Sequence, residues 1–512
     1  MSQRIIMLQY ALVLIWCIYA VNADPCIPRE FENGTVCVCN ATYCDSTPAY
    51  DLPEIGFYIR YTSNEDGLRL DKTQGAFGNV STSEEELLVL LRNITYQRIH
   101  GFGGSFTDSA CISIKSLSED AQKNLMSSYF SSEGNAYNLG RVPIAGTDFS
   151  TRLYTYDDYS GDLLLKNFSL ADEDLYYKIP LMQQALEMSP ELKFIAASWS
   201  APPWMKTNND YIGLGFLLKE YYQLYAEYLI KFLDEYENHG LEMWAISTGN
   251  EPNDAFIDGY EINSLTWLSS TIAEWVAENL GPTLSESKHN KTLILALDDQ
   301  TFYLPNFVEE MFVNETAKNY TAGIAVHWYY DTDTPSSVLQ ETHDLFPDKF
   351  LLMTEAAVAA NLSDGKLLLG SWDSGEKYIM DIIDNLRNWV TGWIDWNLAL
   401  NEEGGPHWHY TYDQSSIVVN AEADEFYKQP LFYAISHFSK FIPRGSVRVE
   451  LTHNQVTNAT VDFVAFVTPE DETVLVIFNK WSEERQVTIS DPERGNIDLQ
   501  LSPNSVQTII YK

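Results

Sequence analysis

The segment YQLYAEYLIKFLDEYENHGLEMWAISTGNEP, residues 222–252, joins the pattern of a helix to that of a buried strand. In its first half, apolar and aromatic residues recur at intervals of three and four, the spacing of one helical face. These residues are Tyr222, Tyr225, Leu229, Phe232 and Tyr236, and Gly240 can end the helix. Residues 243–247 then form a short apolar run suited to a strand buried on both faces. The segment is therefore one helix and one strand, ending at Asn250-Glu251-Pro252.

The same strand pattern returns along the middle of the chain. Similar short apolar runs occupy residues 194–198, 323–327, 350–353 and 393–396. The segments between them are long enough for helices, as parallel strands joined by crossovers require. We therefore predict an α/β fold with a (β/α)₈ TIM barrel, in which chemistry is located where the strands end.

The segments before and after this region have strand patterns without the helical patterns that alternate with strands in the middle of the chain. Residues 57–61 and 87–94 carry many β-branched and aromatic residues. After about residue 443 the helical periodicity disappears and alternating runs replace it, at residues 461–464, 474–478, 486–489, 497–501 and 506–511. We predict a discontinuous C-terminal β-sandwich that the early strands join.

Two glutamates follow predicted strands and are candidates for glycoside hydrolysis, which needs two carboxyls beside one bond. Glu251 stands between Asn250, which can bind substrate, and Pro252, which stiffens the turn. Glu355 lies just past the run 350–353. Most glutamates are solvated surface charges, and a position at a strand end alone does not identify the reaction.

Aromatic residues also gather at or just after the predicted strand ends, where a flat ring could stack on a sugar. They are Trp199, Trp204, Trp328, Tyr329, Trp393 and Trp396. Because buried aromatic residues are usually part of a core, we expect about half of them to be structural.

The first 23 residues have the order of a cleaved secretory signal: Arg4, an apolar run over residues 5–21, and a small-residue site before Asp24. A membrane anchor is the alternative, but the run contains Gln9 and is shorter than the ~20 residues that span a bilayer. The rest of the 512-residue chain exceeds the ~100–200 residues of a usual domain, so we expect one large domain with smaller attachments.

Cysteine usage fits an oxidising compartment. Cys26, Cys37, Cys39 and Cys44 crowd one short segment, for which two local disulfides are the simplest outcome. Zinc is the alternative, although one residue between Cys37 and Cys39 is too few for a typical zinc pair. We expect Cys111 to be a buried free thiol.

Ten Asn-x-Ser/Thr sequons lack an intervening proline, a density that predicts N-glycosylation in a secreted chain. They begin at Asn33, Asn40, Asn79, Asn93, Asn167, Asn290, Asn314, Asn319, Asn361 and Asn458. The formal net charge is −40, which argues against nucleic acid as a partner. This charge falls as pH approaches about 4.5, so the composition suits an acidic lumen.

A series of motifs in order along the chain carries a specific resemblance. Besides the cysteine cluster they are Gly101-Phe102-Gly103-Gly104, Arg141-Val142-Pro143, Lys206-Thr207-Asn208, Asn250-Glu251-Pro252, His327-Trp328-Tyr329, residues 395–400 (DWNLAL), residues 426–430 and residues 439–443. With them the chain resembles the glucosylceramidases of glycoside hydrolase family 30 from Cys26 into its C-terminal tail.

The resemblance implies a retaining β-glucosidase that releases glucose from glucosylceramide at acidic pH through a covalent glucosyl-enzyme. It implies Glu251 as acid/base and Glu355 as nucleophile, with their carboxyls about 5–5.5 Å apart. It further implies that Arg141 supports the nucleophile and that the substrate is bound by Asp148, Trp199, Asn250, Tyr329 and Trp396. The implied disulfides are Cys26–Cys37 and Cys39–Cys44, and no metal or organic cofactor is implied.

The same resemblance implies a division of the chain. A small N-terminal sheet would take residues 24–49 with about 400–427, the β-sandwich residues 50–97 with 444–512, and the catalytic barrel residues 98–399 with 428–443. The implied destination is the lysosome lumen or another acidic lumen, with a saposin-type activator and a membrane surface as possible partners.

Two alternatives to this function stay open from the sequence. Another family 30 β-glycosidase, such as a xylosidase or a β-1,6-glucanase, would use the same two carboxylates. A non-catalytic sugar- or lipid-binding protein on the same barrel is disfavoured because both Glu251 and Glu355 are present.

Overall fold

The computed structural model describes residues 24–47, 50, 52–78, 86–359, 367–409, 413–453 and 460–512. The predicted signal, residues 1–23, therefore lies outside the described residues, as do the sequon asparagines Asn79, Asn361 and Asn458. Within the described ranges, no helix combines the length and the apolar character needed to cross a membrane.

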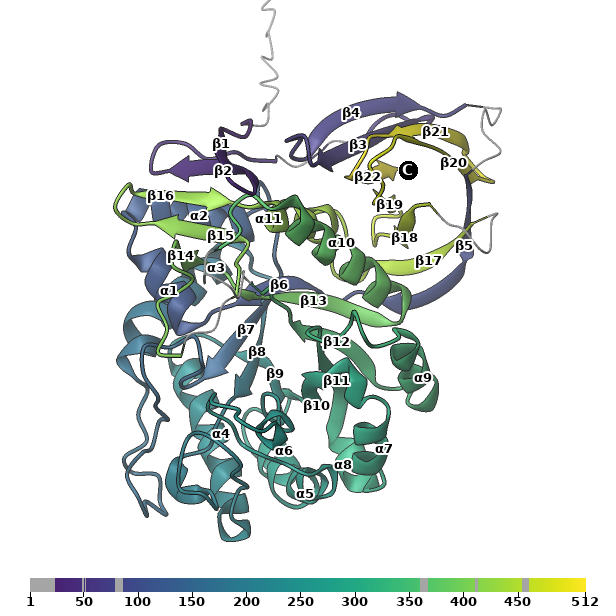
Figure 1. Ribbon diagram of the computed structural model, residues 1–512. Helices are drawn as coiled ribbons and strands as arrows, with labels where there is room; N and C mark the ends of the chain where they lie inside the picture. Colours follow the sequence, from purple (N-terminus) through teal and green to yellow (C-terminus); the bar gives the residue numbers. More distant parts are fainter. Residues whose placement is uncertain are drawn as a thin grey trace, which may run out of the picture.

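Eight parallel strands close into a barrel at the centre of the molecule (Figure 1). In chain order they are β6 (Gly101–Ser105), β7 (Leu139–Ile144), β8 (Lys193–Ser198), β9 (Met243–Ser247), β10 (Leu293–Gln300), β11 (Thr321–His327), β12 (Phe350–Glu355) and β13 (Val390–Asn397). β13 pairs with β6 to close the ring. The closure needs a glycine, because a Cβ at Gly392 would lie 2.3 Å from the carbonyl oxygen of Gly101. The predicted TIM barrel is confirmed.

Helices alternate with the barrel strands and surround them. The helix predicted from the opening segment is α4 (Tyr222–Asn238), and its regularly spaced aromatic residues are buried. The others are α1 (Asp108–Lys115), α2 (Glu119–Phe130), α3 (Ile179–Met188), α5 (Ser269–Trp275), α6 (Gly281–Glu286), α7 (Asn306–Phe312), α8 (Glu315–Tyr320), α9 (Ser337–Leu345), α10 (Trp372–Arg387) and α11 (Pro430–Ser439). Single turns include η1 (Glu173–Lys178), η2 (Pro203–Met205), η3 (Lys219–Tyr221), η4 (Asp254–Phe256), η5 (Val276–Leu280) and η6 (Thr301–Tyr303).

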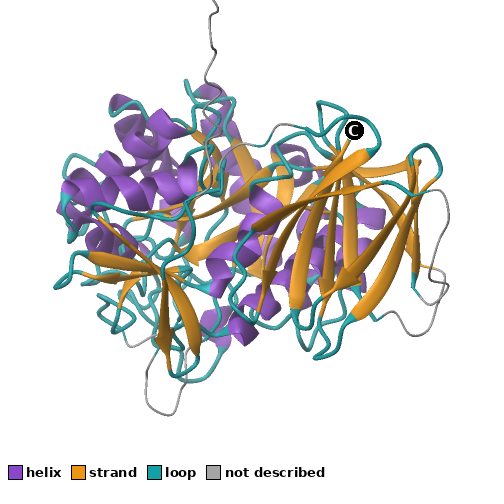
Figure 2. Ribbon diagram, turned by 90° about the horizontal axis from the view of Figure 1, so that it is seen from above, coloured by secondary structure: helices purple, strands orange, loops and turns teal. Residues whose placement is uncertain are grey.

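A nine-stranded sheet lies beside the barrel and combines both flanks of the chain (Figure 2). Its order is β21-β20-β5-β17-β18-β19-β22-β3-β4. The strands are β3 (Phe57–Asn64), β4 (Asp71–Ala76), β5 (Leu87–Arg98), β17 (Val447–His453), β18 (Asp462–Val467), β19 (Thr473–Asn479), β20 (Arg485–Asp491), β21 (Gly495–Leu501) and β22 (Ser505–Tyr511). β5 pairs with β17 and β20, and β3 with β22, so the predicted discontinuous sandwich is confirmed.

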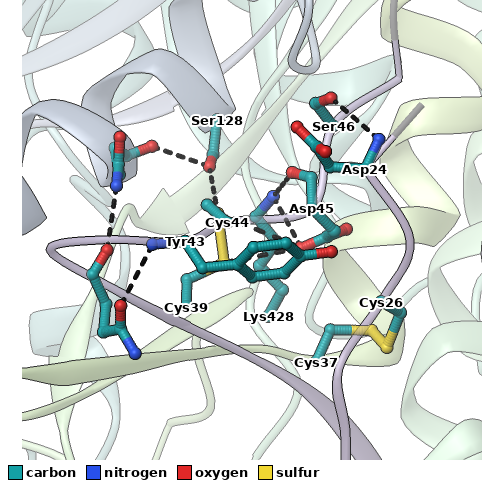
Figure 3. Close-up of a disulfide and its surroundings, with 12 residues drawn as sticks. Asp24, Cys26, Cys37, Cys39, Tyr43, Cys44, Asp45, Ser46, Ser128 and Lys428 are labelled. Atoms are coloured by element: carbon teal, nitrogen blue, oxygen red, sulfur yellow. Dashed lines mark hydrogen bonds and ion pairs between the residues drawn. A yellow bond between two sulfur atoms is a disulfide. The ribbon is translucent and has the colours of Figure 1, made fainter. Parts of the chain in front are cut away.

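The third sheet is small and contains the N-terminal disulfides. Its order is β1 (Pro28–Phe31), β2 (Gly34–Asn40), β16 (Glu425–Lys428), β15 (Ile417–Asn420) and β14 (Leu400–Asn401). Figure 3 shows the Cys26–Cys37 and Cys39–Cys44 bonds, which confirm the implied pairing and exclude zinc at these sulfurs. Cys111 is a buried free thiol, as predicted. We propose that the chain divides into domains along these three sheets.

Candidate active site

The two candidate glutamates meet at the carboxyl end of the barrel. Glu355 is the last residue of β12, and Glu251 follows β9 by four residues. One carboxylate oxygen of Glu251 lies within 4.8 Å of one from Glu355. Both side chains are largely buried, with exposed fractions of 11% for Glu251 and 6% for Glu355. The pair is therefore largely shielded from solvent.

The backbone at Glu251 is strained. Its φ of +43° lies in the left-handed region, which costs about 1–3 kcal/mol for a residue other than glycine. Hydrogen bonds on both sides hold it there: its N–H donates to the carbonyl oxygen of Asp298 (2.9 Å), and its own carbonyl accepts from Asp254 N–H (3.2 Å). The turn aims the Glu251 side chain at its neighbours in a conformation that the surrounding strands impose.

Arg141, on β7, is a fully buried cation of the site. Its guanidinium donates to Glu355, to Asn250 Oδ1 (2.6 Å) and to Asp298 Oδ2 (3.0 Å). It also lies over two stacked rings, 5.0 Å from the Trp199 centroid and 5.4 Å from that of Trp396. Burial opposes its charge, but Asp298 and Glu355 raise the pKa of Arg141 overall. One guanidinium thereby orients four of the predicted site residues.

His327, at the end of β11, connects Glu251 to Asp298. Its Nδ1 lies 2.9 Å from Glu251 Oε1 and its Nε2 lies 3.1 Å from Asp298 Oδ1. Burial lowers the pKa of His327, but Glu355, Asp298 and Glu251 together raise it to about 10. The ring is therefore an imidazolium that donates from both nitrogens, and with Arg141 it holds the pKa of Asp298 far below its usual range despite burial.

Glu355 has a hydrogen-bond donor on each oxygen. Arg141 donates to Oε2, and the Tyr329 hydroxyl donates to Oε1 at 2.7 Å. Burial raises the pKa of Glu355, Arg141 and His327 oppose that shift, and the net direction is upward. The ionised carboxylate can accept both bonds, so both of its oxygens are held in place.

Glu251 is enclosed by polar groups of a different kind. Gln300 Nε2 donates to its Oε1 at 2.9 Å, and the Asp254 carboxyl hydrogen-bonds to its side chain. Burial disfavours the Glu251 carboxylate, but His327, Asp254 and Arg141 lower its pKa overall. In the same pair, burial and the charge of Glu251 raise the pKa of Asp254 to about 10.

The structure brings together every residue for which the resemblance implied a place at the site. Asp148, after β7, is buried, and burial with the charges of Glu355 and Asp413 raises its pKa. Trp199 and Trp396 lie under Arg141, and Asn250 and Tyr329 bond to Arg141 and Glu355. These placements supply geometry, whereas the catalytic roles stay predictions.

Of the other three aromatic residues at strand ends, Trp204 and Trp393 are buried and Trp328 is partly buried. Their indole N–H groups donate as follows: Trp204 to Asp157 O (2.9 Å), Trp328 to Ala357 O (3.0 Å) and Trp393 to Asp381 Oδ2 (2.7 Å). These bonds hold the three indoles in place, and the expectation that half of the aromatic set is structural stays a prediction.

Four residues that surround Glu251 were not predicted: Asp298, Asp299, His327 and Asp254. A usable signal existed for the first two, because the apolar run at the start of β10 is followed directly by two acids, the same pattern that identified Glu355. His327 lies inside a quoted motif, but its two contacts depend on strand pairing. Asp254 had no signal that separates it from a surface acid.

A metal ion does not fit this cluster. Glu251, His327 and Glu355 each place one potential ligand atom within 4.8 Å of the others. A ligating imidazole must be neutral, whereas both His327 nitrogens face carboxylates and its pKa is raised to about 10. Arg141 adds a second fixed positive charge beside Glu355. The cluster is an ion-pair network whose cations are side chains.

Comparisons with known proteins place these residues in context. Residues 99–442 match the glycosyl hydrolase family 30 TIM-barrel domain, and residues 445–509 match the family 30 beta sandwich domain. The chain is 42% identical over 501 residues to lysosomal acid glucosylceramidase of Mus musculus, covering 96% of this chain and 97% of that protein. It is 38% identical over 521 residues to putative glucosylceramidase 4 of Caenorhabditis elegans, covering 99% and 100%. The crystal structure of SrfJ from Salmonella typhimurium superposes with a TM-score of 0.83 at 31% identity, covering 89% of this chain and 99% of that one.

Proposed function

The chain belongs to glycosyl hydrolase family 30, and from that premise we propose that it is a retaining β-glucosidase that hydrolyses glucosylceramide to glucose and ceramide. The observation that carries the proposal is the close approach of two buried carboxyls, Glu251 and Glu355, whose nearest oxygens lie within 4.8 Å. Retaining enzymes hold their carboxyl groups about 5–5.5 Å apart, whereas inverting enzymes need about 6.5–9.5 Å to admit a water. The relatives named glucosylceramidase support this substrate.

In the proposed first step, ionised Glu355 attacks the anomeric carbon while Glu251 donates a proton to the departing oxygen. The glycosidic bond breaks as an ester bond forms to Glu355, and the configuration inverts once. The donors Arg141 and Tyr329 support this role because they fix the attacking carboxylate. Glu251, now ionised, then removes a proton from water, which attacks the same carbon and releases glucose with overall retention.

The sugar site is proposed to lie among these groups. Trp199 and Trp396 offer flat ring surface, while Asp148 and Asn250 offer polar atoms to sugar hydroxyls. No metal ion or organic cofactor is proposed, because nucleophile, acid and charge stabilisation all come from side chains.

The loops at the same barrel end support a lipid aglycone. Phe256 and Ile257, on the turn after Glu251, are 49% and 47% exposed. Phe302 and Tyr330 follow β10 and β11, are 42% and 45% exposed, and pack ring to ring with centroids 5.2 Å apart. Apolar side chains that stay exposed beside a buried charged site are suited to binding hydrocarbon chains.

We further propose that the protein acts in the lysosome or another acidic lumen at a membrane surface, where a saposin-type activator could present the lipid. The lysosomal relative and the strongly acidic composition support this placement. N-glycosylation at the sequons is part of the same proposal. Of the described sequon asparagines, Asn33, Asn93, Asn167, Asn290 and Asn319 are exposed.

The two carboxyl roles can be separated by azide rescue. Glu251→Gln keeps the nucleophile, so an activated aryl β-glucoside should still glycosylate it, and turnover should fall by about 10²–10⁴ because deglycosylation lacks its base. Azide needs no base and should restore turnover, giving β-glucosyl azide. Glu355→Gln should give only the α-azide, by a single inversion. Exchanged products, or a Glu251→Gln variant that azide does not rescue, would contradict the assignment.

The substrate is tested separately with the unaltered protein. At acidic pH we expect release of glucose from dispersed glucosylceramide and from aryl β-glucosides, and much slower hydrolysis of aryl β-xylosides. Faster hydrolysis of the xyloside would favour another family 30 activity and leave the retaining mechanism in place.

A further inference from the structure

Asp254 lies next to the proposed acid/base and has no part in the mechanism given above. It opens the single turn η4, three residues after Glu251, and its N–H donates to the Glu251 carbonyl at 3.2 Å. The two side-chain carboxyls are hydrogen-bonded to each other as well. Backbone and side chain therefore join the same two residues.

A hydrogen bond between two carboxyl groups requires a proton, because an ionised carboxylate only accepts. The Glu251–Asp254 pair thus carries one proton when the bond is formed, and that proton belongs to the pair rather than to one residue. Glu251 Oε1 already receives bonds from His327 Nδ1 and Gln300 Nε2. Among the described residues, the charged and titratable groups that face this pair are Arg141, Asp148, Tyr260, Asp299, Tyr303, His327, Tyr329, Glu355 and Asp413.

The turn that carries Asp254 is anchored from the barrel. Asn253 donates to Asp299 Oδ2 from both its backbone N–H (3.1 Å) and its side-chain Nδ2 (2.9 Å). Asp299 belongs to β10, so this pair of bonds ties the turn to a strand of the barrel wall. Asp254 is thereby held against Glu251 by a rigid element.

We propose that Asp254 is a positioning residue that holds the catalytic proton against Glu251 and supplies it for departure of the aglycone. The proposal rests on the acid/base role proposed for Glu251. In the first step the shared proton moves along the hydrogen bond to Glu251 and from there to the leaving oxygen, so both carboxyls become ionised. In the second step the pair takes one proton back from the attacking water, so it again holds one proton at the end of the cycle.

The electrostatics place the resting proton on the Asp254 side of the pair, because the hydrogen bond from Asp254 lowers the pKa of Glu251. Burial and the charge of Glu251 raise the pKa of Asp254 to about 10, so the pair keeps its proton well above the range in which a lone glutamate would lose it. Two ionised neighbours also make a stronger base, which suits the second step. Asp254 therefore extends the general acid toward higher pH and strengthens the general base.

The test is the pH dependence of kcat/KM for Asp254→Asn, measured on aryl β-glucosides with a poor and a good leaving group. An asparagine cannot share a proton and instead donates to the Glu251 carboxylate, so the alkaline limb should move to lower pH by about one unit or more. The loss should be larger for the poor leaving group, which depends on the acid. Asp258→Asn is the matched control, because Asp258 is exposed on the same loop.

A purely structural role for Asp254 would lower activity equally at every pH and would leave the limb in place; that result would overturn the proposal. Asp254→Ala provides a second variant should the first fail to fold, and it too removes the shared proton. Azide rescue of Glu251→Gln reports on the acid/base role independently. If azide rescues Glu251→Gln but the alkaline limb of the Asp254 variants does not move, the role of Asp254 is rejected while the acid/base role of Glu251 stands.

Discussion

The two ends of the barrel are built from the same eight strands and are opposite in chemistry. An interior layer is formed by apolar side chains that pack together, namely Leu139, Ile195, Ala245, Leu295, Ala325, Leu352 and Ile394. The carboxyl end contains two buried cations, Arg141 and His327, and the acids Glu251, Asp298 and Glu355. A few residues along each strand separate these two environments.

This difference shows which part of the barrel stabilises the fold and which part lowers its stability. Burial of the apolar layer stabilises the barrel at any pH, by about 25 cal/mol per Å² of apolar surface. The charged end has the opposite balance, because burying ions costs several kcal/mol each unless every charge is paired. The strained Glu251 backbone adds to that cost. The active site is therefore a local instability that the rest of the barrel offsets.

Replacing the central cation should give the largest loss of stability and activity at the charged end. Arg141→Gln leaves Glu355 and Asp298 buried without their shared partner, so we expect a stability loss of about 3–5 kcal/mol and a fall in kcat/KM of about 10²-fold or more. Chemical denaturation and kinetics on an aryl β-glucoside would measure both effects.

Lys178 provides the matched control for Arg141. It is also fully buried between two acids, Asp108 (3.2 Å) and Asp174 (2.8 Å), but it lies outside the site. Lys178→Met should lose comparable stability while the folded fraction keeps its kcat. An Arg141→Gln enzyme with normal kcat/KM would show that the cation serves folding alone.

At the apolar end we expect a loss of stability without a change in the pH dependence of activity. Leu295→Ala removes a fully buried side chain from the interior layer and should cost about 2–5 kcal/mol of stability. Below its melting temperature the variant should keep the pH profile of the unaltered enzyme, because Leu295 lies among the apolar side chains of that layer. A displaced limb of the profile would mean that the two ends are coupled through the backbone of β10.

Local pattern was sufficient to predict one end of the barrel and only part of the other. Runs such as residues 243–247 and 350–353 are apolar because they are buried on both faces, so their strands could be located. Strands β6, β7 and β10 were not located: the first contains two adjacent glycines, the second a proline, and the third ends in polar residues.

The site residues also divide into those that local pattern or the resemblance predicted and those that neither predicted. Glu251 and Glu355 were predicted from strand ends, and the resemblance supplied Arg141 and the sugar-facing residues. His327 contacts Glu251 across 76 positions of sequence, and Asp298 contacts Arg141 across 157. Contacts of this kind depend on barrel closure and register, which a single sequence does not specify. Asp254 was missed for a different reason: it lies only three residues after Glu251, but nothing in its local pattern separates it from a surface acid.

The last expected effect concerns how stability depends on pH at the charged end. Asp395, on β13, is fully buried, and Tyr378 and Ser416 hydroxyls donate to its two oxygens at 2.7 and 2.6 Å. Burial raises the pKa of Asp395 to about 7. A folded-state pKa above the unfolded value means that the group's contribution is complete below about pH 4 and is lost as pH rises toward 7.

Asp395→Asn should therefore flatten the fall in unfolding free energy between about pH 4 and 7, by up to about 1.4 kcal/mol per pH unit. Loss of one hydrogen bond should add a constant destabilisation of about 0.5–1.5 kcal/mol, which does not change the slope. Melting temperatures across this pH range would measure the slope, with Asp373→Asn, an exposed acid on α10, as control. Asp299 and Asp413, with pKa values raised by burial to about 7 and 8, act in the same direction. Their shared sign predicts a protein most stable at acidic pH, and an unchanged slope in Asp395→Asn would assign that preference to the other buried acids.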